Sequence, residues 1–338
     1  MEPALHRLTI PADHSGRRLD QVLAELLPDY SRSRLKQWIL EGHVRLDGAS
    51  PEPRTRVMEG QVIELQLGGL EAAPADSFAA PAAESMPLQI VHEDADVLVI
   101  NKPPGLVVHP GAGNPTGTLQ NGLLAHAPIL AELPRSGILH RLDKDTSGLL
   151  IVAKTLIAHT HLVRDLESRA ITREYRALCV GPMTAGGSVD AAIARHRTQR
   201  TKMAVMDFGG RRAVTHYRVL GRFPHHTFVA VRLETGRTHQ IRVHLAHVRH
   251  PIVGDPAYGG RLIVPAGASE QLALALRGFR RQALHACRIQ FTHPVTGAAL
   301  DFRAPLPADF RGLLAALVGD TAAVDRLEAL PWPEQMAN

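Results

Sequence analysis

The sequence is poor in cysteine. Only Cys179 and Cys287 occur in its 338 residues, far apart and without a C-x-x-C spacing. So small a set excludes the disulfide framework of a small secreted domain and argues against a cysteine metal site. The scarcity of cysteine therefore favours a protein of the reducing cytoplasm.

Long apolar runs are missing as well. The first residues, MEPALHRLTIPADHSG, lack the apolar stretch of a signal peptide. No run reaches the roughly 20 apolar residues that a membrane-spanning helix needs. We therefore expect a cytoplasmic protein without a membrane partner.

The common cofactor motifs are absent too. No strand is followed by G-x-G-x-x-G, and G-x-x-x-x-G-K-[ST] does not occur. His239, His244 and His247 lie close in sequence, but no H-E-x-x-H or similar ligand set completes them, which favours hydrogen-bonded structure. Ser147 is not in a G-x-S-x-G elbow, so a cap or turn role is favoured over a nucleophile. The sequence predicts no metal and no cofactor.

What the sequence does contain is an ordinary apolar content of 45% and a net charge of +5. The apolar content is enough for a sizeable core, and the length predicts about two domains. The modest excess of basic residues favours a polyanionic partner.

The chain divides at residues 70–86, an Ala/Pro-rich stretch without an apolar period that is typical of an exposed linker. We expect a small unit over residues 1–69, a larger one over 87–325, and a C-terminal tail over 326–338. Two separately folded domains are therefore predicted.

The small unit has the pattern of two helices followed by two short strands. Apolar residues at helical spacing run through RRLDQVLAELL, and Ser31 is placed to cap a second helix, SRSRLKQWILEG, that Gly42 would end. HVRLDG and QVIELQL read as strands. Arg32, Arg34 and Lys36 lie together on the second helix, either as a solvated charged face or as a docking face for RNA phosphates.

SRSRLKQWILEGHVRLDG, followed by VMEGQVIEL, resembles the S4 RNA-binding domain over about residues 18–65. The resemblance implies a small α/β unit that lays this helix and the turn after it against structured RNA. The unit is roughly neutral, so any RNA contact must be local.

Downstream of residue 87 the sequence becomes rich in strands. LQIVHEDADVLVINKP reads as two strands joined by a turn, and at least four more strands follow in GLLIVAKT, REYRALCVG, VTHYRVLGRF and TFVAVRLETG. Helices fit LIAHTHLVRDLESR and HQIRVHLAHV. Because strands outnumber helices without regular alternation, the pattern predicts an α+β fold with a mixed, largely antiparallel sheet.

Three polar clusters interrupt these strands at residues 101–111, 140–148 and 233–244, and each contains a glycine. In HRLDKDTSG, Asp143 and Asp145 are two residues apart and point to one side of an extended segment. Arg237 in the third cluster could keep an inward carboxylate ionised. An ionised, arginine-oriented aspartate suits nucleophilic or electrostatic catalysis at a sugar carbon, and a structural ion pair is the alternative.

NKPPGLVVHPG, HRLDKDTSGLLIVAKT, REYRAL and LETGRTHQIRVHLAH occur in the order and spacing of the RluA-type pseudouridine synthases, and the resemblance extends through residues 87–306. It implies cleavage of the N-glycosidic bond of a uridine in RNA and reattachment of uracil through C5, an isomerisation that needs no cofactor. It implies that Asp143 is the catalytic aspartate, that Tyr175 stacks on the uracil, that Arg237 pairs with Asp143, and that Arg141 fills the gap left by a flipped base. Whether Asp143 attacks the sugar or the base stays open.

RHRTQRTKMAVMDFGGRR at residues 195–212 carries six basic residues against one aspartate. A solvated hairpin is one interpretation and an RNA-gripping arm is the other, with Arg195, Arg197, Arg200 and Lys202 as candidate contacts. Together with the S4 resemblance, the family implies an enzyme acting on specific uridines of large-subunit (23S) ribosomal RNA or its assembly precursor. A monomer is the default expectation, since the sequence does not determine the oligomeric state. The alternatives are a synthase of the same family acting on other ribosomal or transfer RNA uridines, and a non-catalytic RNA-binding protein.

Overall fold

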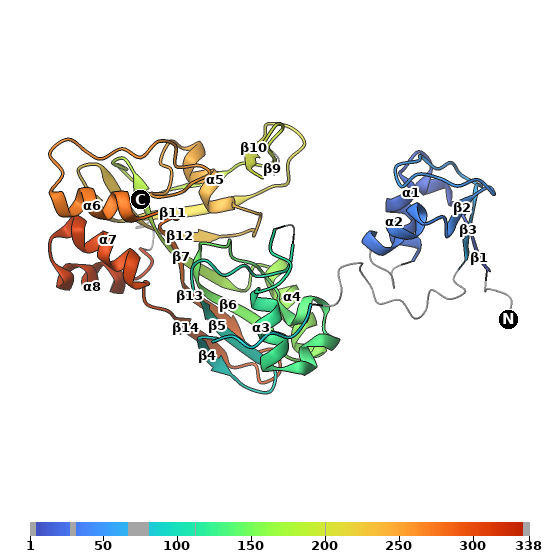
Figure 1. The fold of residues 1–338 in the computed structure, drawn as a ribbon, viewed down its shortest axis with the longest axis horizontal. Coiled ribbons are helices and arrows are strands. Elements are labelled where there is room, and N and C mark those ends of the chain that lie inside the picture. The colour runs from blue at the N-terminus through green and yellow to red at the C-terminus, as the bar shows by residue number, and fades with distance from the viewer. Residues whose placement is uncertain (1–4, 28–31, 67–80, 112, 200, 334–338) are drawn as a thin grey trace. The chain divides into compact units, whose positions relative to one another are not determined.

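A computed structural model describes residues 5–27, 32–66, 81–111, 113–199 and 201–333, which fold into two compact units (Figure 1). The units cover Met1–Ala82 and Ala83–Asn338. The division falls inside the predicted linker, of which residues 70–80 lie outside the described part of the chain. In the described parts, no helix is long and apolar enough to cross a membrane.

The N-terminal unit packs two helices on a small antiparallel sheet with the strand order β1-β3-β2. Its elements are β1 (Leu5–Thr9), η1 (Ala12–His14), α1 (Leu19–Leu26), α2 (Arg32–Leu40), β2 (Val44–Leu46) and β3 (Val62–Gln66). Leu19, Val22 and Leu23 of α1 are fully buried against Leu35 and Trp38 of α2, as the helical spacing requires. Both predicted helices and both predicted strands are confirmed, although Ser31, the predicted cap, lies outside the described residues.

The second unit is built on one mixed sheet of nine strands in the order β4-β5-β6-β13-β7-β12-β11-β8, with β14 pairing β13. The strands are β4 (Ile90–Glu93), β5 (Val97–Lys102), β6 (Ser147–Ala153), β7 (Thr172–Val180), β8 (Gly187–Asp190), β11 (Val214–Phe223), β12 (His226–Leu233), β13 (Leu284–Thr292) and β14 (Ala299–Arg303). Every pairing is antiparallel except that of β6 with β13, which has only two registered pairs, Ser147 with His285 and Gly148 with Ala286. The predicted α+β class is confirmed.

Helices cover this sheet and give it two hydrophobic cores. They are α3 (Leu119–His126), η2 (Pro128–Glu132), η3 (Pro134–Gly137), α4 (Leu156–Glu167), α5 (Gln240–His247), α6 (Glu270–Gly278), α7 (Ala308–Val318) and α8 (Thr321–Ala329). Along β6, Leu150 and Val152 enter one core while Leu149 and Ile151 enter the other. Burial on both faces explains why this strand reads as an unbroken apolar run.

The predicted boundary at residue 325 falls inside α8, so the C-terminal segment is not a separate tail. Val324 is buried in the main core, and Leu327 packs against it. Beyond the helix, Arg176 Nη2 donates to the carbonyl of Leu330, and the Trp332 ring lies 4.3 Å from the guanidinium of Arg232. The apolar period of α8 and these contacts extend the second unit at least to Trp332.

Residues 193–205 form a two-stranded hairpin, β9 (Ile193–Arg195) and β10 (Met203–Val205), that projects from the body of the second unit (Figure 1). Its turn is organised by His196, whose Nδ1 accepts hydrogen bonds from the backbone N–H groups of Thr198 and Gln199. We call this hairpin, with the loop that follows it to Arg212, the arm.

Candidate active site

The loop that carries HRLDKDT leads into β6, an inner strand of the sheet, and hydrogen bonds from Lys102, Arg281 and Gln282 fix it in place. Lys102 is fully buried, and its Nζ donates to the carbonyls of Pro103, Leu106 and Lys144 at 2.8–2.9 Å. Burial lowers the pKa of Lys102 to about 7, although the charges of Asp145 and Asp143 act in the opposite direction. The ammonium group therefore ties the loop containing Lys144 to the end of β5.

On the other side of this loop, Arg281 Nη1 donates to the carbonyl of Asp145, and Gln282 Nε2 donates to Thr146 Oγ1. Gly148 then passes so close to β13 that a Cβ there would lie 2.2 Å from the carbonyl oxygen of Ala286, and its φ is +114°. Only glycine fits this crossing. The loop thus has little freedom to move away from the sheet.

The three polar clusters predicted from the sequence meet at one pocket. Its lining residues are Val107, Val108, Arg141, Leu142, Asp143, Lys144, Asp145, His239, Arg242 and Gln282. The first cluster contributes the valines, the second contributes residues 141–145, and the third contributes His239 and Arg242. Asp143 and Asp145 both line this pocket, and so does Lys144 between them, so the pocket does not show the alternation expected from their spacing.

Asp143 is held by Arg242, a residue of α5. Arg242 Nη1 lies 2.8 Å from Asp143 Oδ2, while its Nε and Nη2 bind both carboxylate oxygens of Asp255 at 2.7 and 2.8 Å. Burial alone would lower the pKa of Arg242, but Asp255 and Asp143 outweigh it and raise that pKa above its usual value. The guanidinium is therefore a fixed cation whose fork grips Asp255 and whose remaining edge orients Asp143.

The prediction that Arg237 pairs with Asp143 was wrong. Arg237 is exposed, its backbone N–H donates to Gln240 Oε1, and its Nε donates to the carbonyl of Arg212 in the arm. The reason is where the helix begins: α5 starts at Gln240, so Arg237 remains in the preceding loop while Arg242 lies inside the helix and faces inward.

The helix was predicted from the sequence, but no signal in its pattern singles out Arg242 as the inward arginine. His239 adopts a left-handed conformation at the N-terminus of α5, and both residues line the pocket. Asp255, which comes later in a loop, had no such signal either.

The other two predicted active-site residues lie near Asp143 in different ways. Arg141 is exposed and lines the pocket. Tyr175 of β7 is only 5% exposed; burial raises the pKa of its phenol, with Arg173 lowering it and Asp143 raising it further. Asp143 therefore lies within electrostatic range of a phenol that stays neutral.

The predicted RNA contacts fall in two places. Arg195 and Arg197 of the arm are exposed, Lys202 is half-buried, and Arg200 lies outside the described residues. In the N-terminal unit Lys36 is exposed on α2; the side chains of Arg32 and Arg34, on the same helix, lie outside the described part.

His244 and Ser147 have structural roles. His244 is fully buried between Thr215 Oγ1 and the carbonyl of Ala191. Ser147, the first residue of β6, hydrogen bonds with His285 Nδ1 at 2.9 Å rather than acting as a cap or turn residue. Neither side chain lines the pocket that contains Asp143.

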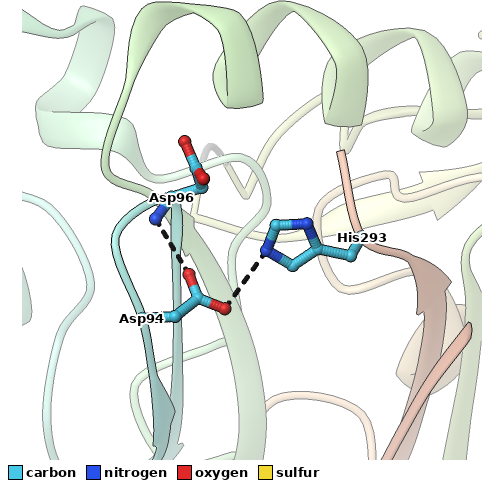
Figure 2. A group of neighbouring side chains, drawn as sticks. All are labelled: Asp94, Asp96 and His293. Atoms are coloured by element: carbon cyan, nitrogen blue, oxygen red, sulfur yellow. Dashed lines mark hydrogen bonds and ion pairs between the residues drawn. The ribbon is translucent and has the colours of Figure 1, made fainter. Parts of the chain in front are cut away.

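Among the described residues, Asp94, Asp96 and His293 form a group whose atoms could surround a metal ion (Figure 2). Asp94 closes the turn between β4 and β5: its Oδ1 accepts from the N–H of Asp96, and its Oδ2 lies 3.1 Å from His293 Nε2. His293 Nδ1 accepts two backbone N–H groups, so the ring proton is on Nε2 and points at Asp94. With both nitrogens occupied, this group fastens a turn and does not resemble a metal site.

Comparison with known proteins shows which family this chain belongs to. A family described as RNA pseudouridylate synthase matches residues 96–247, and the S4 domain matches residues 17–63. Ribosomal large subunit pseudouridine synthase D of Vibrio parahaemolyticus is 54% identical over 314 residues, which cover 93% of this chain and 94% of the relative. The chain belongs to the RNA pseudouridylate synthase family.

Other relatives of this synthase agree along nearly the whole chain. The protein of the same description from Xanthomonas campestris is 51% identical over 97% of both chains. Among solved structures, Human RNA Pseudouridylate Synthase Domain Containing 4 is 28% identical with a TM-score of 0.53 and covers 68% of this chain and 92% of its own. Human RNA Pseudouridylate Synthase Domain Containing 1 is 26% identical with a TM-score of 0.51, over 73% and 97%.

The synthase is therefore an enzyme that isomerises uridine to pseudouridine in RNA, with an S4 domain ahead of its catalytic unit. The family resemblance and the S4 resemblance inferred from the sequence are both confirmed. The matched family and the relatives are synthases, which argues against the alternative of a non-catalytic RNA-binding protein.

Proposed function

We propose that this synthase converts specific uridines of large-subunit ribosomal RNA to pseudouridine. Relatives that are 51–55% identical over most of the chain carry the description of ribosomal large subunit pseudouridine synthase D. The arrangement of two units, one an S4 domain and the other the catalytic unit, matches an RNA substrate whose shape is read away from the reacting base.

Asp143 is the reacting group in this proposal, and its ion pair with Arg242 carries the argument. Arg242 occupies Oδ2, so the carboxylate stays oriented while Oδ1 remains available in the pocket. A uridine stacked in RNA is inaccessible there, and the base must be flipped out to reach it. Arg141, exposed on the same pocket, is placed to occupy the gap that the flipped base leaves.

Tyr175 is proposed to stack on the uracil. Its ring lies in the main core, and the charge of Asp143 contributes to raising the pKa of its hydroxyl. Tyr175 is 5% exposed and is not among the residues that line the pocket, so this stacking requires its ring to become accessible when the flipped uridine enters.

The arm is proposed to grip RNA beside the pocket. It exposes Arg195 and Arg197, and Phe208 in its loop is 89% exposed. Basic side chains bind phosphates and exposed aromatic rings stack on unpaired bases, so this combination fits a partly single-stranded substrate. Lys36 on α2 would make a second, separate contact from the S4 domain.

We infer that the enzyme works as a cytoplasmic monomer without metal or cofactor. The reaction only exchanges an N–C bond for a C–C bond and moves one proton from C5 to N1, so no oxidant, reductant or nucleotide is required.

The test is a pseudouridine map of ribosomal and transfer RNA from cells that lack the protein. The map is repeated after complementation with the natural protein and with Asp143→Asn. We expect specific large-subunit sites to lose pseudouridine, to regain it with the natural protein, and to stay unmodified with Asp143→Asn. Sites lost only from transfer RNA would overturn the proposed substrate, and restoration by Asp143→Asn would overturn the role of Asp143.

A further inference from the structure

Tyr258, which no sequence motif singled out, joins the arm to the active site. Its hydroxyl accepts a hydrogen bond from the backbone N–H of Met203 in β10 at 2.8 Å and lies 2.8 Å from Nδ1 of His239. Its own backbone N–H is fixed by Asp255, the partner of Arg242, and its ring lies 5.1 Å from the Arg242 guanidinium. Tyr258 thus contacts both His239 and Arg242, the two side chains that lie beside Asp143.

The contacts of Tyr258 favour one tautomer of His239. Met203 N–H donates to the phenol oxygen, and His239 Nδ1 is the acceptor within reach of the phenol's one proton. The neutral imidazole then carries its own hydrogen on Nε2. Nε2 lies 3.9 Å from Asp143 Oδ1, the carboxylate oxygen that Arg242 leaves free.

We propose that Tyr258 and His239 are positioning residues that present an N–H to Asp143 Oδ1 and keep that oxygen unpaired and ready to react. The proposal rests on the role of Asp143 given above. A neutral N–H near Oδ1 orients it without forming an ion pair. A protonated imidazolium in the same place would instead pair with Oδ1 and compete with the substrate.

The surroundings of His239 favour its neutral form. Burial lowers the pKa of His239; the charged groups that face it are Asp143 and Arg141 from the loop before β6, Arg242 from α5, and Asp255 from the following loop. The hydroxyl of Tyr258 adds to this because a proton on Nδ1 would face a group that is already donating to it. Removing that hydroxyl frees Nδ1 to take a proton.

The experiment uses full-length Tyr258→Phe, His239→Gln and the double variant under single-turnover conditions with saturating ribosomal RNA. Phenylalanine keeps the ring against Arg242, and glutamine has an N–H at about the position of Nε2 but does not titrate. For Tyr258→Phe we expect the acidic limb of the rate profile to move to higher pH, since His239 Nδ1 loses a hydrogen-bond donor that opposes its protonation, while burial still lowers the His239 pKa. The double variant should show no such shift.

A uniform loss of rate at every pH in Tyr258→Phe, or the same shift in the double variant, would overturn the proposal. Urea unfolding and RNA binding of each variant establish that the comparison is made between folded, RNA-bound enzymes. Asp143→Asn is assayed alongside: if it retained activity, the role of Asp143 itself would fail, which is a different result from an unshifted Tyr258→Phe profile.

Discussion

Replacing Arg242 should damage both the stability and the activity of the enzyme, whereas replacing Arg237 should do little. Arg242 makes three charge-assisted hydrogen bonds, two to Asp255 and one to Asp143, with all three side chains at most 14% exposed. Arg242→Met leaves two buried carboxylates without their cation. Breaking a buried pair in this way lowers the free energy of unfolding by about 3–5 kcal/mol.

The catalytic effect follows from the same contacts. With Oδ2 of Asp143 released, the carboxylate is no longer held toward the pocket, and we expect the single-turnover rate to fall at least about 100-fold, as for loss of a preorganised electrostatic contact. Arg242→Lys restores the charge but not the planar fork, so it should recover part of the stability and less of the rate.

The matched control is Arg237→Met, the same substitution in the same motif. Arg237 is exposed and its side chain donates only to the carbonyl of Arg212, so its stability should change by no more than about 0.5 kcal/mol. Urea unfolding gives the free energies, and single-turnover conversion of ribosomal RNA gives the rates. Equal losses of stability in the two variants would refute the assignment of Arg242 as the partner of Asp143.

Three further predictions concern the scaffold. Lys102→Met should lower the free energy of unfolding by about 3 kcal/mol in urea titrations, because the carbonyls of Pro103, Leu106 and Lys144 lose a charged donor. The pKa of Asp94 is held at about 2, since hydrogen bonds from Val97, His92 and Asp96 outweigh burial. Its contribution to stability is complete above about pH 4 and is lost as the pH falls through 2, so Asp94→Asn should flatten the acid dependence of unfolding in that window. Removing residues 1–82 should weaken RNA binding in a filter assay while circular dichroism shows a folded catalytic unit, because each unit has its own core.

Much of the fold was predictable because its signals are local. The helices of the N-terminal unit follow from apolar spacing, and β6 follows from an unbroken apolar run that only a strand buried on both faces accepts. The convergence of three polar loops was also predictable, since each follows or precedes a strand of the same sheet. Elements that were not predicted from the sequence, such as β13 and α8, have a less regular hydrophobic pattern and depend on long-range packing.

The site was predictable in its residue types but not in every pairing. The family resemblance identified Asp143 and Arg141, yet the choice between Arg237 and Arg242 depended on the residue at which α5 begins. Helix boundaries are among the features hardest to predict from a sequence. Here α5 begins three residues after Arg237, so Arg242 lies inside the helix and Arg237 lies outside it. Tyr258 could not be predicted, because its role comes from contacts with Met203 and His239 across the fold.

The short parallel pairing of β6 with β13 divides the catalytic sheet into two halves. On one side lie β4, β5 and β6 with the loop that holds Asp143; on the other lie β12 and its neighbours, followed by the helix that holds Arg242 (Figure 1). Only two registered residue pairs join the halves along this line, so its amides should exchange with solvent before those in the centre of either half. The Asp143–Arg242 ion pair spans the same line, so a twist of one half against the other changes the separation of the two reactive-site charges. The β6–β13 boundary, which has the fewest registered pairs, is thus also the boundary across which Asp143 and Arg242 are held together. RNA that binds both halves should therefore slow amide hydrogen exchange first at this boundary.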